Sequence, residues 1–299
     1  MKSQTCNLIE ALTCSKVSLL SHALLIVLAV PGPFALTVFA AQPAYVISAG
    51  ISGNGAFGIV NPRTGAYQPI GPVEPDGYFG LAPGPHGSLL SLTYTANLVS
   101  INPKTGVPTQ VGPTGLDSCL IPLPSCPPTT AFSLGGFEGK VYATDWANDI
   151  YLVNQQTGMA TLLTSSSGVP SSPFVPGSQN PDGTYNFADE AIWQSGGKLY
   201  LTYDAVVVDL TSFSVIDVVS PTLYQLDPAT GHATAIGPTA PGIGGVYNVN
   251  GVDYAFDDLT GQILQLDLSS GNTTQVGYFA PGAGVIQGAV PVSASSFKR

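Results

Sequence analysis

Carboxylates near two tryptophans are the side chains of this sequence that are best suited to chemistry. Each carboxylate ends or opens a short apolar run, and Trp146 and Trp193 lie beside two of these positions. Such groups can bind Ca²⁺ or a sugar, and the ligand-binding candidates are Asp145, Trp146, Asp189, Glu190, Trp193, Asp204, Asp257 and Asp258. Paired carboxylates beside aromatic rings are also what glycoside hydrolysis requires, for which the catalytic candidates are Glu190, Asp189 and Asp257.

A structural role for the same carboxylates is the competing interpretation. Asp145, Asp204 and Asp257 recur at equivalent positions, each at the end of an alternating apolar segment. A carboxylate in such a position can accept backbone hydrogen bonds and hold the loop that follows. A catalytic group need occur only once, whereas a group that builds a repeat recurs. The recurrence therefore favours structure over binding, and binding over catalysis.

Other chemistries find little support in the sequence. After residue 40 the histidines are His86 and His232, which lie in predicted turns far apart in the chain. A histidine-based triad or a histidine-rich metal site is therefore not expected. The glycines lie at turns and not in a loop that opens a helix, which argues against phosphate binding of that kind. We expect no cofactor. Ca²⁺ is the ion that the carboxylates could attract.

One phrase recurs five times along the chain. An apolar strand leads into Asn or Asp, a Thr-Gly or Ser-Gly turn follows, and a second strand comes next; the turn glycines are Gly65, Gly106, Gly158, Gly231 and Gly271. Asn or Asp bonds the backbone two residues on, and Gly takes the position with positive φ, so each phrase predicts a β-hairpin. Spacings near 40 residues leave room for four short strands, the size of a propeller blade.

The remaining segments complete five units of four strands. Runs rich in Gly and Ala, such as 79–82 and 245–248, suit innermost strands, where blades crowd around an axis. The first strand after residue 40, near Tyr45, is the second strand of a unit, and the last, near Val285, is a first strand. We therefore predict an all-β, five-bladed β-propeller of four-stranded antiparallel blades, closed by pairing of the N- and C-terminal strands. An open β-sandwich is the alternative.

The connections of such a ring fall on two faces. Turns from first to second strands and from third to fourth strands share one face, which we call the short-turn face. The insertions 113–130, 164–189 and 205–221 fall on the opposite, loop face, together with most carboxylates, whereas Arg63, Lys104, Lys140 and Lys198 map to the short-turn face. The net charge is −10, so the acidic face would repel nucleic acid and anionic membranes. Loops on a rigid scaffold commonly bind ligands; a merely solubilising surface is the alternative.

The N-terminal segment has the features of an export signal. Lys2 and Lys16 precede the apolar run 17–30, and small residues near Ala40 suit cleavage after that position. An uncleaved membrane anchor is the alternative, although prolines interrupt a run that is marginal for a span of about 20 residues. We predict a signal peptide at 1–40, one propeller domain at 41–291 and a disordered tail at 292–299. The mature protein would be secreted, extracellular or periplasmic, with no membrane span.

Cysteine usage agrees with export. Cys6 and Cys14 would leave with the signal, whereas Cys119 and Cys126 remain in one proline-rich loop that contains no histidine. Two isolated cysteines suit a disulfide and not a zinc site. The bridge would close a small loop, so we expect it to stiffen that loop locally.

The segment 226–237, Leu-Asp-Pro-Ala-Thr-Gly-His-Ala-Thr-Ala-Ile-Gly, resembles a repeat of exported bacterial β-propeller proteins of unassigned function. Similar repeats occur in quinoprotein-like and NHL-like propellers. The resemblance extends over nearly all of residues 44–290. It implies blades, and it implies neither a site nor a cofactor pocket.

Three hypotheses for the function follow. The leading one is a monomeric, non-catalytic extracellular binding module that uses the acidic loop face for a glycan, a protein or Ca²⁺. The second is an extracellular hydrolase of the five-bladed glycoside hydrolase type that acts through the loop-face carboxylates. The third is a purely structural surface protein. The shared location of insertions and carboxylates favours the first.

Overall fold

The computed structural model describes residues 42–49, 55–72, 77–117, 130–165, 167–170, 179–209 and 214–292. These residues belong to one compact unit, 39–299. The predicted signal segment, the loop with Cys119 and Cys126, and the tail from residue 293 lie outside the described residues, so the cleavage and disulfide predictions stay untested. No helix in the described part of the chain is long and apolar enough to cross a membrane.

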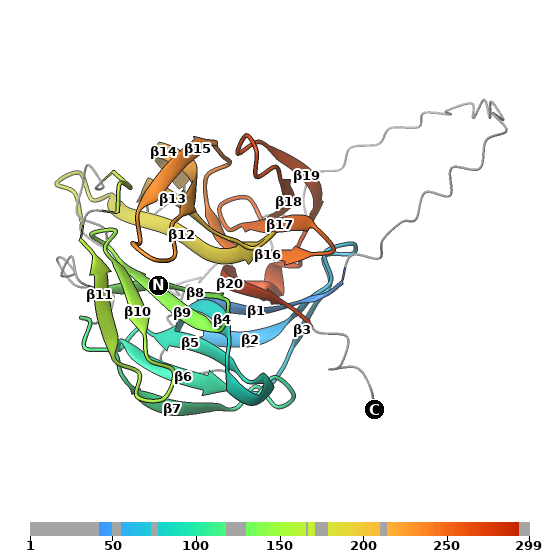
Figure 1. The fold of residues 1–299 in the computed structure, drawn as a ribbon. Coiled ribbons are helices and arrows are strands. Elements are labelled where there is room, and N and C mark those ends of the chain that lie inside the picture. The colour runs from blue at the N-terminus through green and yellow to red at the C-terminus, as the bar shows by residue number, and fades with distance from the viewer. Residues whose placement is uncertain are drawn as a thin grey trace, which may run out of the picture. The chain divides into compact units, whose positions relative to one another are not determined.

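The described strands form five antiparallel, four-stranded sheets that are the blades of a five-bladed β-propeller (Figure 1). Blades I and II contain, in order from the axis, β20 (Val285–Pro291), β1 (Ala44–Ala49), β2 (Gly55–Val60) and β3 (Tyr67–Pro69), then β4 (Tyr78–Pro83), β5 (Leu89–Thr93), β6 (Asn97–Ile101) and β7 (Pro108–Pro113). Blade III contains β8 (Ala131–Phe137), β9 (Lys140–Asp145), β10 (Ile150–Val153) and β11 (Ala160–Thr164). Blades IV and V contain β12 (Tyr185–Ser195), β13 (Lys198–Asp209), β14 (Ser214–Leu226) and β15 (Ala233–Pro238), then β16 (Ile243–Val249), β17 (Val252–Asp257), β18 (Gln262–Leu266) and β19 (Thr273–Tyr278). The predicted fold class is confirmed.

Blade I closes the ring with strands from both ends of the described chain. β20 pairs antiparallel with β1, in a register that runs from Ala44 opposite Pro291 to Ala49 opposite Val285. Without β20, the backbone groups along one edge of β1 would be unpaired. The predicted closure by N- and C-terminal strands is thus confirmed.

The innermost strands β4, β8, β12, β16 and β20 contact one another in a closed ring. Gly80 in β4 shows why small residues recur there. Its φ is +60°, and a Cβ at this position would overlap the backbone nitrogen of Leu134 in β8. Only glycine permits both this conformation and this close approach of two blades.

The recurrent hairpins have the predicted turn structure. In each, the side-chain Oδ1 of Asn or Asp accepts the N–H two residues later; the accepting residues are Asn61, Asn102, Asn154, Asp227 and Asp267. The turn glycine has a second function. A Cβ on Gly106, whose φ is +68°, would overlap the carbonyl oxygen of Ile70 in blade I. The turn therefore fits closely against the preceding blade.

The turns from first to second strands are equally short. In three blades the connection is two residues long and both have positive φ, as type I′ hairpins require; the pairs are Glu138-Gly139, Gly196-Gly197 and Asn250-Gly251. In blade II the connection 84–88 is longer and includes His86 and Gly87, both with positive φ. These pairs lie on the short-turn face. Because the turns are tight, no long loop connects a first strand to a second strand on that face in the part of the chain that the structure describes.

Blade IV departs from the predicted pattern. The insertion 205–221, expected to be a loop, contains the end of β13 and the start of β14, and 185–188 belongs to β12. The reason is local: β-branched Val206 pairs with Val218, and Val208 with Val215, and such residues favour strands. The loop prediction was wrong for these segments, and β12, β13 and β14 are 11, 12 and 13 residues long.

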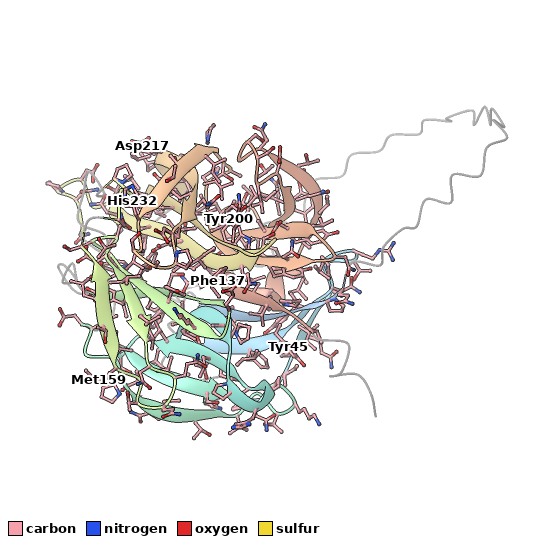
Figure 2. All side chains as sticks on the ribbon, viewed as in Figure 1. Tyr45, Phe137, Met159, Tyr200, Asp217 and His232 are labelled. Carbon is pink, nitrogen blue, oxygen red and sulfur yellow. The ribbon has the colours of Figure 1, made fainter. Side chains whose placement is uncertain are left out.

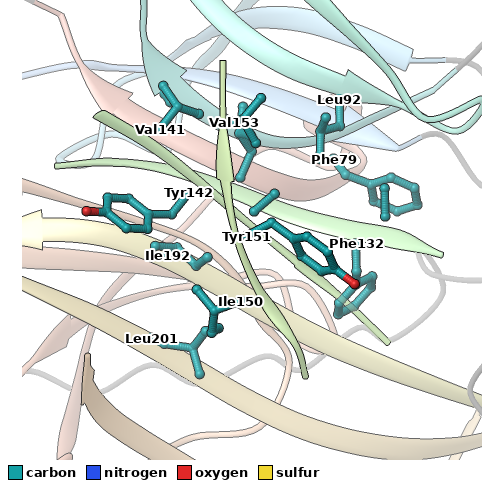
Figure 3. Packing of buried hydrophobic residues seen from close by; sticks show 14 of the residues in the cluster. Phe79, Leu92, Phe132, Val141, Tyr142, Ile150, Tyr151, Val153, Ile192 and Leu201 are labelled. Carbon is teal, nitrogen blue, oxygen red and sulfur yellow. The ribbon is translucent and has the colours of Figure 1, made fainter. Parts of the chain in front are cut away.

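Apolar side chains between neighbouring blades form the core. One buried cluster crosses blades II, III and IV and includes Leu92, Phe132, Ile150 and Leu201 (Figure 3). The rings of Phe132 and Trp146 meet edge to face, with centroids 6.0 Å apart. Close packing of this kind gives the residues around the axis a rigid support.

Candidate functional site

Asp145 and Asp257, two of the predicted ligands, are engaged in holding turns. Oδ1 of Asp145 accepts the N–H groups of Ala147 and Asp149, each at 3.0 Å, and its Oδ2 accepts the Tyr151 hydroxyl at 2.8 Å. Burial raises the pKa of Asp145 to about 6. Oδ1 of Asp257 accepts the backbone N–H groups of Leu259 and Thr260, and its Oδ2 accepts the Thr260 hydroxyl. Both carboxylates thus stabilise the turn that follows their strand.

Four of the predicted carboxylates come together where blades IV and V meet, and we call them the acidic cluster: Asp189, Asp204, Asp257 and Asp258. Oδ2 of Asp204 accepts the N–H of Gly242 at 2.6 Å, and Oδ1 of Asp258 accepts that of Ile286 at 2.6 Å. Burial raises the pKa of all four, to about 6 for Asp189. Repulsion from neighbouring carboxylates raises the pKa of Asp204 and Asp258 further.

The acidic cluster lies far from the basic side chains in the fold. In the part of the chain that the structure describes, the lysines and the arginine lie at the short-turn ends of strands, at Arg63, Lys104, Lys140 and Lys198. The predicted separation of charge between the two faces is therefore present. Among the described residues, no three His, Cys, Asp or Glu side chains are arranged to hold a metal ion. The Ca²⁺ prediction stays a prediction.

Glu190 is separate from the acidic cluster, because it faces blade III. Its Oε2 accepts the Thr144 hydroxyl at 2.7 Å, and its Oε1 has no hydrogen-bond partner among the described residues. Burial raises the pKa of Glu190 well above its usual range, and the charge of Asp145 adds to the effect. These surroundings favour the neutral carboxyl form.

The two tryptophans lie at opposite ends of the propeller axis. Trp146 follows β9 on the loop face, where it is buried against Phe132. Trp193 lies near the short-turn end of β12, and its indole N–H donates to Oδ1 of Asp253 at 2.9 Å. The structure therefore does not bring Trp193 together with the loop-face carboxylates, because a strand rises about 3.3 Å per residue and Trp193 is four residues beyond Asp189.

A cavity of about 320 Å³ lies on the axis at the short-turn face. All five innermost strands line it, with Pro83, Phe137, Trp193, Tyr247 and Val290 among the lining residues. Phe137 lies near the centre of the ring, whereas Met159 lies at its periphery (Figure 2). Deeper along the axis, Gly80, Gly244 and Gly288 surround a space that leaves no volume for a water molecule. The cavity is therefore a pocket with a closed end.

A hydrogen-bonded network forms one wall of this axial cavity. Besides the indole of Trp193, Asp253 accepts the Ser195 hydroxyl at 2.9 Å and the Asn248 side-chain amide at 3.1 Å, both through Oδ2. Burial raises the pKa of Asp253, and the three donors oppose that effect. The network joins blade IV to blade V and fixes the side chains that line the cavity.

The rim of the axial cavity carries two charged side chains, Glu138 and Lys140, both exposed. The backbone N–H of Glu138 donates to Oε1 of Gln194 at 3.1 Å, which ties the β8–β9 turn to β12. Lys140 also lines a neighbouring groove of about 370 Å³, together with Asn154, Gln155 and Gln156. The two openings share Gly139 and Lys140, so they adjoin at this turn.

Sequence reasoning did not point to this cavity, because it placed binding on the loop face, where the insertions and carboxylates lie. None of the three described cavities is lined by the predicted carboxylates. Parts of the loop-face insertions lie outside the described residues, so the loop-face site stays a prediction. Trp193 is the only predicted site residue that lines one. Ser195 and Asn248 resemble ordinary strand residues in the sequence. A usable signal was present in the tight turns, which place no long described loop on that face.

No protein-family model matches this sequence, and no curated protein matches it. Three solved structures illustrate the similarities found. A nidogen/laminin complex chain is 9% identical over 83% of this chain and 97% of that chain, with a TM-score of 0.46. A Bacteroides thetaiotaomicron protein of unknown function is 13% identical over 80% and 59%, with a TM-score of 0.46. The PQQ-bound aldose sugar dehydrogenase of Streptomyces coelicolor is 12% identical over 72% and 85%, with a TM-score of 0.41. At these identities and TM-scores the similarities carry no argument about function.

Proposed function

We propose that this protein is a secreted, non-catalytic binding module that holds a polar ligand in the axial cavity of the short-turn face. The observation that carries the proposal is a closed-ended cavity of about 320 Å³ to which all five blades contribute. Ligand pockets are typically concave, of about 300–1,000 Å³, and lined by apolar side chains with a few oriented polar groups. The Asp253 network supplies that orientation.

The side chains that line the axial cavity favour binding over hydrolysis. Glycoside hydrolysis requires two carboxyl groups about 5–9.5 Å apart across the scissile bond. Glu138 is the carboxylate that lines this cavity, whereas Asp253 lies behind the wall with three donors on it. On the loop face, Asp257 bonds its own turn through both oxygens. Hydrolysis would need a second carboxylate in the described lining of the cavity, which holds only Glu138, whereas binding needs only the groups that are already there.

A ligand screen with a blocked cavity tests the proposal. Gly196 lines the cavity, has a φ of +54°, and has open space where a Cβ would lie, so Gly196→Trp adds a large side chain at the lining of the cavity. Gly183 also has positive φ and open space, but it lies on the loop face, so Gly183→Trp is the matched control. We expect compounds that raise the melting temperature of the wild type to do so in Gly183→Trp and not in Gly196→Trp. Equal shifts in both variants would contradict the proposal.

A further inference from the structure

We infer that the ligand of the axial cavity is a peptide in an extended conformation; this inference rests on the proposed binding function. The first argument is shape. The axial cavity and the neighbouring groove both have Gly139 and Lys140 in their lining, so the two openings lie on either side of the β8–β9 turn. A compact ligand would use one of these openings, whereas an extended chain uses both.

Hydrogen-bonding capacity is the second argument. Gln194 uses Oε1 to accept the Glu138 N–H, which leaves its Nε2 as a donor. Asn248 donates Nδ2 to Ser195 and Asp253, which leaves its Oδ1 as an acceptor. Both side chains line the axial cavity. One donor and one acceptor are what a peptide group, with its own C=O and N–H, requires.

The neighbouring groove adds one more amide. Asn154, Gln155 and Gln156 line it. Oδ1 of Asn154 accepts the backbone N–H groups of Gln156 and Thr157, and Nε2 of Gln155 donates to the carbonyl oxygen of Gly139 at 2.6 Å. The exposed side-chain amide of Gln156 supplies a donor and an acceptor of the same kind as those in the axial cavity.

The exposure of the aromatic rings argues for a peptide and against an oligosaccharide. Sugar recognition relies on an accessible ring face on which the sugar stacks. The rings that line the axial cavity are those of Phe137, Trp193 and Tyr247, and their exposed fractions are 7%, 4% and 1%. Trp193 is covered further by Tyr200, which stacks on it at 5.7 Å. None of these rings offers a platform.

The charges at the rim indicate what the peptide carries. Glu138 and Lys140 lie on either side of Gly139, and both line the cavity. Glu138 adopts a φ of +47° in the β8–β9 turn, and its exposed side chain lies at the rim of the cavity. One negative and one positive group match a ligand with an ammonium and a carboxylate, such as a short peptide with free termini.

Calorimetric titration with three probes tests the inference: trialanine with free termini, trialanine acetylated and amidated at its ends, and cellotriose. We expect both peptides to bind the wild type, the free one about two- to fivefold more tightly, which is the range for exposed ion pairs. Glu138→Gln and Lys140→Gln should each reduce that preference. Lys104→Gln, a change on the same face that lines neither opening, should leave it unchanged.

Several outcomes would overturn the inference. Tighter binding of cellotriose than of either peptide would identify a sugar site, and equal binding of free and capped trialanine would remove the assigned roles of Glu138 and Lys140. If neither peptide binds while other compounds still stabilise the wild type and not Gly196→Trp, the peptide inference fails and the binding function stands. If no compound distinguishes Gly196→Trp from Gly183→Trp, the binding function itself fails.

Discussion

Asp189 and Asp204 lie directly opposite each other on β12 and β13, and the backbone N–H of Asp189 donates to Oδ1 of Asp204 at 3.2 Å. Like charges at directly opposed positions destabilise a sheet. Burial raises the pKa of both carboxyls, and the charge of Asp189 raises that of Asp204 further. The fold therefore favours protonation of this pair, and the stability of the protein is linked to pH.

The free energy of unfolding should rise as the pH falls from 8 to 5. The folded-state pKa of Asp189 is about 6, above the unfolded value of about 3.9. Between these values the folded state binds more protons, so stability is present at low pH and is lost as the pH rises through about 6. Urea unfolding at intervals of half a pH unit measures this, and stability that increases from pH 5 to pH 8 would contradict it.

Asp189→Asn should stabilise the protein at pH 8. The substitution removes one of two opposed charges, and we expect a gain of about 1–3 kcal/mol, since one pKa unit corresponds to about 1.4 kcal/mol. The variant should also show a weaker dependence of stability on pH. Asp217→Asn, an exposed change in the same blade, is the matched control and should leave the unfolding curve unchanged.

Asp253→Ala should destabilise the protein strongly. The substitution leaves three buried or half-buried donors, those of Trp193, Ser195 and Asn248, without their acceptor. We expect a loss of roughly 2–4 kcal/mol, because unsatisfied buried polar groups carry a full desolvation penalty. Denaturant unfolding measures the loss, with Asp217→Ala as the control. A change below about 0.5 kcal/mol would show that the network contributes little.

The two classes of turn glycine should respond differently to alanine. Gly106→Ala places a Cβ against the carbonyl oxygen of Ile70, whereas Gly87→Ala, at a similar positive φ, meets open space. Both variants bear the same backbone strain, so their difference isolates the contact between blades. We expect the free energy of unfolding of Gly106→Ala to be about 1–3 kcal/mol lower than that of Gly87→Ala, which is the range for overpacking. Equal losses would show that this contact is dispensable.

Removal of β20 should abolish cooperative folding. A chain that ends at Gly284 exposes the edge of β1 and opens the ring, because β20 is the partner of β1 in blade I. Near-UV circular dichroism and size-exclusion chromatography should show lost tertiary structure and aggregation. A chain that ends at Val292, which keeps β20, is the control and should behave as the full chain does.

The blades could be predicted from the sequence because their determinants are local. Asn102 bonds the N–H two residues on, and Gly106 takes the positive φ, so the hairpin is encoded within a few residues and repeats. The order of strands then predicted the closure of the ring. Blade IV shows the limit of this reasoning. The strand was predicted to end at Asp204, with a loop after it, but β13 continues to Asp209 through the β-branched residues Val206 and Val208.

The axial cavity could not be predicted because its determinants are not local. Trp193 and Asp253 are 60 residues apart in the sequence, and nothing in either segment indicates that the two side chains meet. Asp145 and Asp257 illustrate the converse problem. Their position suggested a ligand site, but both oxygens of each are used by residues nearby in the chain. A carboxylate at a strand end is therefore weak evidence for binding.

The most direct test of the binding face uses the two tryptophans of the chain as reporters. Trp193 lines the axial cavity, and Trp146 lies on the loop face. In Trp146→Phe, the remaining fluorescence comes from Trp193; in Trp193→Phe, it comes from Trp146. A ligand that stabilises the wild type should change the emission of Trp146→Phe and leave that of Trp193→Phe unaltered. A ligand-dependent change in Trp193→Phe alone would place the site on the loop face and contradict binding in the axial cavity.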